Sequence, residues 1–142
     1  MWTMKKGKYQ PDHVIQDQVQ KIADKFGLSL VMLFGSFANV TNTKESDVDI
    51  AYVKTDKLAT AQEIELALEF ENLFKVERAD IVYIPDMSPI FMYMTLNDGI
   101  VLFAQSETIF PSFYSYSIKR LYDNMSLYQM RLDHLCKKHQ IA

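Results

Sequence analysis

Two pairs of residues in the first half of the chain have the types and spacing of a phosphate and metal site. Gly35 and Ser36 directly follow an apolar run that ends at Phe34. Asp47 and Asp49 come after ten further residues. A glycine after a strand lets the backbone approach a ligand, and a serine at the start of a helical turn offers a hydroxyl and free N–H groups to an anion. We therefore expect Gly35 and Ser36 to bind phosphate.

The two aspartates lie in a segment that alternates between acidic and apolar residues. On a strand, Asp47 and Asp49 point to one face, whereas Val48 and Ile50 point to the other. Two like charges on one face repel each other unless a cation lies between them. Carboxylate oxygens in such an arrangement suit Mg²⁺ or Mn²⁺. This pattern predicts a divalent metal site at Asp47 and Asp49.

Asp80 is the candidate for a third carboxylate, because it interrupts an apolar run from Ala79 to Ile84 that reads as a strand. If this strand lies next to the Asp47–Asp49 strand, all three acids converge at one edge of the sheet. Such a site can support an in-line displacement in which a nucleoside triphosphate loses pyrophosphate. Asp80 could then orient or deprotonate the attacking hydroxyl. A second interpretation is that Asp80 only forms an ion pair with Arg78.

The elements that position these residues follow from hydrophobic periodicity and from turn residues. The pattern predicts an α/β (α+β) fold, with helices on a sheet of about four strands. Thr60 is the expected N-cap of the second helix, with Glu63 completing a capping box. The expected helices begin at Pro11, Thr60, Ser88–Pro89 and just after Pro111, and the expected strands are Leu28–Phe34, Val48–Val53, Ala79–Ile84 and Ile100–Phe103.

Composition limits the classes of protein to which the chain can belong. Its 142 residues suit a single domain spanning 1–142, and the formal net charge of −3 argues against a stable complex with nucleic acid. Cys136 is the only cysteine, so no internal disulfide can form. There is neither a signal-peptide pattern nor an apolar run of membrane-spanning length, so we expect a cytoplasmic protein with no membrane partner.

The last predicted helix, about 112–139, carries apolar residues that alternate by three and four positions. This stripe consists of Ile118, Leu121, Met125, Tyr128, Leu132 and Leu135. Such a stripe packs either on its own domain or on a partner protein. The helix is long for so small a body, so the second interpretation stays open.

The run from Gly35 to Asp49 resembles the GS-x10-DxD signature of the polymerase-beta-like nucleotidyltransferase superfamily. The chain's short length is similar to that of the minimal nucleotidyltransferases (MNT), which are antitoxin partners of HEPN-domain toxins. The likeness extends from Leu28 to about Phe103. The chain departs from many relatives in having Asn39 and Val40 where they have Arg and Gly, so one phosphate contact is missing unless Lys44 replaces it.

The resemblance implies that Gly35 and Ser36 hold the triphosphate of ATP, and that Asp47, Asp49 and Asp80 are catalytic residues that bind Mg²⁺. It also implies a mixed sheet with helical cover, and transfer of AMP from ATP to a hydroxyl. In the antitoxin branch that hydroxyl belongs to a tyrosine of the cognate HEPN toxin, which the modification silences. Two other interpretations stay open: an antitoxin that acts only by binding and occlusion, and an enzyme that modifies a small molecule or an RNA end.

Overall fold

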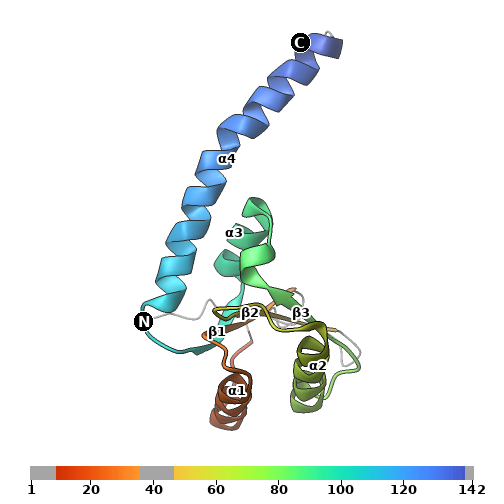
Figure 1. Cartoon of the computed structure of the whole chain (residues 1–142), viewed down its shortest axis with the longest axis vertical. Helices are drawn as coiled ribbons and strands as arrows, with labels where there is room; N and C mark the ends of the chain where they lie inside the picture. Colours follow the sequence, from red (N-terminus) through yellow and green to blue (C-terminus); the bar gives the residue numbers. More distant parts are fainter. Residues whose placement is uncertain (1–8, 36–46, 140–142) are drawn as a thin grey trace.

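The computed structural model describes residues 9–35 and 47–139, which form a four-stranded mixed sheet with helices on both faces (Figure 1). The predicted fold class is confirmed. In chain order the elements are α1 (His13–Phe26), β1 (Leu30–Phe34), β2 (Val48–Val53), α2 (Thr60–Phe74), β3 (Ala79–Tyr83), the 3₁₀ helix η2 (Ile84–Asp86), α3 (Pro89–Asp98), β4 (Ile100–Ala104) and α4 (Ile109–His139).

The strand order is β3-β2-β1-β4, so β1 and β2 are the central strands. β1 runs antiparallel to both of its neighbours, whereas β2 and β3 are parallel. A parallel pair needs a crossover connection, and α2 provides it. Because β2 and β3 run in the same direction, their first residues lie at the same end of the sheet.

Two apolar cores lie on opposite faces of the sheet. One contains Leu33, Ile50 and Tyr52 together with buried residues of α1 and α2. The other contains Met32 and Ala51 together with buried residues of α3 and the start of α4. The fold is therefore a three-layer arrangement, with α1 and α2 on one side of the sheet and α3 on the other (Figure 1).

Local signals set most of the helix ends. The Asp12 carboxylate accepts the Ile15 N–H at 2.9 Å to cap α1, and Gly27 ends it with a left-handed φ of 68°. Ser88 caps α3 as predicted. The predicted capping box of α2 is wrong, because its N-cap is Ala59 and the Gln62 side chain accepts the Ala59 N–H at 3.2 Å.

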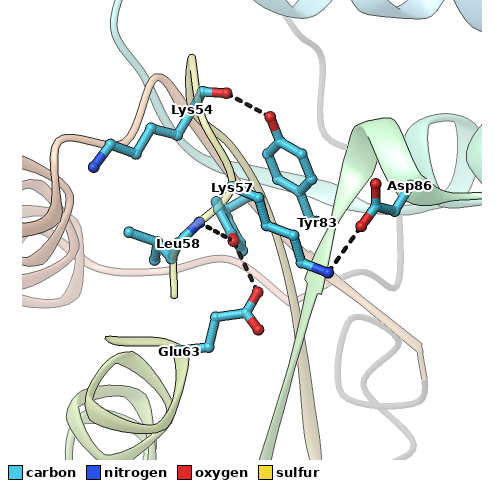
Figure 2. Close-up of polar contacts among 7 residues, drawn as sticks. Lys54, Lys57, Leu58, Glu63, Tyr83 and Asp86 are labelled. Carbon is cyan, nitrogen blue, oxygen red and sulfur yellow. Dashed lines mark hydrogen bonds and ion pairs between the residues drawn. The ribbon is translucent and has the colours of Figure 1, made fainter. Parts of the chain in front are cut away.

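Glu63 lies outside that capping box and accepts a hydrogen bond of 2.8 Å from the Tyr52 hydroxyl. The same hydroxyl accepts the backbone N–H of Leu58 at 3.0 Å. Beside it, the Tyr83 hydroxyl donates to the Lys54 carbonyl at 2.8 Å (Figure 2). These bonds connect β2 and β3 to the segment that leads into α2, and so they hold β2 in place at the end opposite Asp49.

Replacing Tyr52 with Phe is expected to lower the free energy of unfolding by about 1–3 kcal/mol, because the buried Leu58 N–H loses its acceptor. Burial, followed by the hydrogen bond to Glu63, raises the pKa of Tyr52 above its ordinary value of 10.0. The folded state therefore keeps a proton that the unfolded state loses above about pH 10, and wild-type stability falls as the pH rises beyond that point. Urea unfolding of both proteins at pH 7 and pH 10.5 measures both effects.

Tyr122, which is 76% exposed on α4, provides the matched control. Tyr122→Phe should leave the free energy of unfolding within about 0.5 kcal/mol of wild type. Equal stability of Tyr52→Phe and wild type at pH 7 would contradict the structural role of this hydroxyl.

Helix α4 is much longer than the part of it that packs on the body. Its buried residues, Phe110 and Ser117, both lie in its first third. The remainder extends away from the sheet, and Met125, Leu132 and Leu135 of the predicted stripe are exposed there (Figure 1). These three residues of the apolar stripe therefore do not pack on this domain. None of the helices in the described residues is long and apolar enough to cross a membrane.

Candidate active site

Phe34, Asp49 and Asp80 lie side by side across three strands at one end of the sheet. The register pairs Phe34 with Asp49 across β1 and β2, and Asp49 with Asp80 across β2 and β3. Residues in register point to the same face. Val48 and Ile50 face the core under α1 and α2, so Asp49 and Asp80 face the α3 side. The convergence of Asp80 with Asp49 that the sequence suggested requires the parallel pairing of β2 with β3, which the structure has.

Gly35 follows Phe34 directly and packs its backbone against Asp49. Its φ of 76° lies in the left-handed region that favours glycine. A Cβ built at this position would overlap the Asp49 carboxylate. The conformation and the close contact both require glycine, so the end of β1 brings exposed backbone next to the acids.

Asp47 lies immediately before β2 and is exposed, whereas Asp49 is half-buried. Burial raises the pKa of Asp49 above its usual value, and the negative charges of Asp80 and Asp47 raise it further. The Arg78 guanidinium opposes this shift. Asp80 and Asp47 are thus both close enough to repel Asp49, which is the electrostatic situation that a cation relieves.

Asp80 also has a positively charged partner. The Arg78 Nε lies 3.0 Å from the Asp80 Oδ1, and both side chains are substantially exposed. The ion pair that the sequence suggested as an alternative role for Asp80 is therefore present. An exposed pair of this kind contributes little to stability, and it leaves the second carboxylate oxygen of Asp80 available.

The carboxylate oxygens of the three aspartates are the ligands that Mg²⁺ and Mn²⁺ prefer. The mutual repulsion at Asp49 and the bare backbone of Gly35 also fit a cation with a phosphate beside it. Within residues 9–35 and 47–139, however, no three acidic, histidine or cysteine side chains are arranged to hold one ion. The donor types fit a divalent metal, but they are not preassembled around a single position.

Ser36, the other half of the expected phosphate site, lies outside the described residues, as do Asn39, Val40 and Lys44.

The structure also places one residue near the site that the sequence did not suggest. The Phe91 ring of α3 packs edge-on against Phe34, with 5.9 Å between ring centroids. Sequence spacing gives no signal for this contact, because it joins two elements far apart in the chain.

Comparison with known proteins identifies the fold. The family model described as polymerase beta, nucleotidyltransferase matches residues 17–108, which is more than half of the chain. No curated protein matches the chain. A solved toxin–antitoxin structure with AMP-PNP is similar, with a TM-score of 0.71 and 22% identity over 84% of this chain and 97% of that chain.

Two further solved structures share this fold. A structure of the toxin–antitoxin MntA–HepT gives a TM-score of 0.67 at 19% identity, covering 87% of this chain and 98% of that one. A tri-AMPylated HEPN toxin from Shewanella oneidensis in complex with MNT antitoxin gives 0.67 at 21% identity, covering 86% and 96%. The matched residues 17–108 contain Gly35 and all three acids. The chain belongs to the polymerase-beta nucleotidyltransferase family.

Proposed function

We propose that this protein is an antitoxin that transfers AMP from ATP to the hydroxyl of a tyrosine on a HEPN-type toxin. This modification silences the toxin. The observation that carries the proposal is the row of Asp49 and Asp80 on neighbouring strands, with the Gly35 backbone against Asp49. Solved relatives of the same fold include a complex with AMP-PNP and one with a tri-AMPylated HEPN toxin. Transfer of AMP from ATP to a HEPN-type toxin agrees with the site residues, the nucleotide and the partner that the sequence predicts.

Each residue has a distinct part in the proposed reaction. Gly35 and Ser36 bind the triphosphate through backbone N–H groups and the serine hydroxyl. Asp80 orients the acceptor hydroxyl and takes its proton. The acceptor oxygen bonds to the α-phosphorus of ATP, the bond from that phosphorus to the oxygen bridging to the β-phosphorus breaks, and pyrophosphate leaves with the electron pair.

Asp47 and Asp49 would hold Mg²⁺ or Mn²⁺, with Asp80 as the third carboxylate ligand. When bound, the metal supplies positive charge that neutralises the phosphates. Burial first, and then the negative charges of Asp80 and Asp47, raise the pKa of Asp49, and the positive charge of Arg78 opposes this shift. The β2–β3 register places Asp80 next to Asp49. The ion pair with Arg78 engages only Oδ1 of Asp80, so its other oxygen would face the acceptor.

Purified protein incubated with Mg²⁺, α-labelled ATP and the cognate HEPN-type toxin tests the proposal. Label should appear on the toxin and should disappear when its target tyrosine is replaced with Phe. Transfer of label to an RNA end or to a small-molecule hydroxyl, with the toxin unlabelled, would establish the alternative acceptor. No transfer of label to any acceptor, while the toxin still binds, would contradict the enzymatic function.

The distal part of α4 is the surface that we expect to hold the toxin. Replacing Met125 and Leu132 with Gln should weaken toxin binding by at least about tenfold, because both side chains are exposed and available to pack on a partner. The stability of the free protein should not change. Calorimetric titration of the toxin measures the dissociation constant, and thermal unfolding checks the fold.

Met130 gives a matched control, because it is 66% exposed on the same helix but lies off the apolar stripe. Met130→Gln should bind the toxin as wild type does. If the Met125–Leu132 double variant binds the toxin as tightly as wild type does, this surface is excluded.

A second experiment separates catalysis from occlusion. If a double variant, Asp47→Asn with Asp49→Asn, still neutralises the toxin as well as wild type, then occlusion by α4, rather than catalysis, is the mechanism.

A further inference from the structure

We propose that Phe91 and Phe34 form the subsite for the base of the bound nucleotide, with the exposed Phe91 ring as its stacking surface. The inference rests on the proposed function, because it assumes that the triphosphate lies at Gly35 and the acids. It adds a substrate-binding role for α3, a helix that contains none of the residues of the GS-x10-DxD signature.

The geometry places an aromatic wall directly beside the acids. Phe34 is paired with Asp49 in the sheet, so its half-buried ring is the next side chain on the α3 face. Phe91 meets that ring edge-on, with an angle of 78° between the ring planes. The wall therefore extends from the strand that carries Asp49 outward to a ring on α3.

Phe91 also leaves a large apolar area uncovered. Three other residues of α3, Met92, Thr95 and Leu96, are buried, so the helix is anchored without Phe91. Phe91 itself is 42% exposed although its ring contacts that of Phe34. An aromatic ring that is supported on one side and open to solvent on another can receive a planar ligand with less ordering than an unsupported side chain.

A nucleobase is the occupant that suits both this ring and its position. A nucleotide whose phosphates contact Gly35 and the acids has its base about one sugar away from them, within reach of the Phe34–Phe91 wall. Stacking on an aromatic ring covers apolar surface of both partners and does not depend on which base is present. The triphosphate and the base are thus bound by separate elements, the β1–β2 strand end and α3.

The experiment compares ATP with inorganic tripolyphosphate, which has the phosphates but no base, each titrated calorimetrically with Mg²⁺ into the full chain. Phe91→Ala should raise the dissociation constant for ATP by about 5- to 100-fold and leave that for tripolyphosphate unchanged. Phe91→Tyr should bind ATP as wild type does. Phe91→Leu, which stays apolar but cannot stack, should behave like Phe91→Ala.

Ile64→Ala is the matched control, because Ile64 is a similarly exposed apolar residue on α2, across the sheet from the site. It should change neither constant. Unchanged ATP binding by Phe91→Ala, or an equal loss for ATP and tripolyphosphate, would overturn the base subsite while leaving the proposed function intact. If wild type binds neither ATP nor tripolyphosphate, both the subsite and the proposed function fail.

Discussion

Replacing Asp49 with Asn is expected to reduce nucleotidyl transfer by at least about 10³-fold, which corresponds to about 4 kcal/mol of transition-state stabilisation. Asp49 lies between Phe34 and Asp80 in the sheet and against the Gly35 backbone, so it is the central acid of the site. Asn keeps the shape of the side chain but removes its negative charge. The rate of label transfer to the toxin, at saturating ATP and Mg²⁺, measures the effect.

The same variant should be more stable than wild type when metal is absent. Burial and the neighbouring charges of Asp80 and Asp47 raise the pKa of Asp49 in the folded protein. The folded state therefore binds a proton more tightly than the unfolded chain does, and the wild-type free energy of unfolding falls as the pH rises through the range between the two pKa values. At pH 7 the ionised carboxylate destabilises the fold, and Asn removes that cost.

Thermal unfolding in EDTA should therefore give a Tm for Asp49→Asn that exceeds the wild-type value at pH 7, with a smaller difference at pH 4. Asp47→Asn is the control, because Asp47 is exposed and its replacement should change stability by no more than about 0.5 kcal/mol. Both variants should lose transfer activity. A lower Tm for Asp49→Asn than for wild type would contradict the inference that the Asp49 charge destabilises the metal-free fold.

Local patterns predicted the elements well where neighbouring residues alone decide the structure. Strand Val48–Val53 and helix Thr60–Phe74 have the predicted bounds, because apolar spacing sets both. The predicted N-cap of α2 was wrong by one residue, because Ala59 caps the helix through Gln62, while Glu63 accepts a hydrogen bond from Tyr52. Strand order was not predictable, because hydrophobic periodicity says which residues are buried but not which strands pair.

The residues of the candidate site also differ in whether the local sequence alone can identify them. Gly35 and the acid pair could be recognised from sequence because they lie within one short segment. Asp80 could be proposed but not placed, since its position depends on the parallel pairing of β2 with β3. Phe91 could not be found at all, because its contact with Phe34 depends on how α3 crosses the sheet.

Replacing Gly35 with Ala is expected to lower transfer by at least about 100-fold and to lower the free energy of unfolding by about 1–3 kcal/mol. Two physical effects contribute. A left-handed φ costs an alanine about 1–2 kcal/mol. The added Cβ also overlaps the Asp49 carboxylate, which must move away from its place in the row of acids.

Gly27 separates these two effects, because its φ of 68° is almost the same but only the end of the flexible Lys54 side chain lies near an added Cβ. Gly27→Ala should lose stability through strain alone and keep full transfer activity. In a double-mutant cycle, Gly35→Ala should cost less stability in an Asp49→Ala background, because the collision is then absent. If Gly35→Ala costs the same in both backgrounds, the glycine serves only the turn, and the loss of transfer must have a cause other than displacement of Asp49.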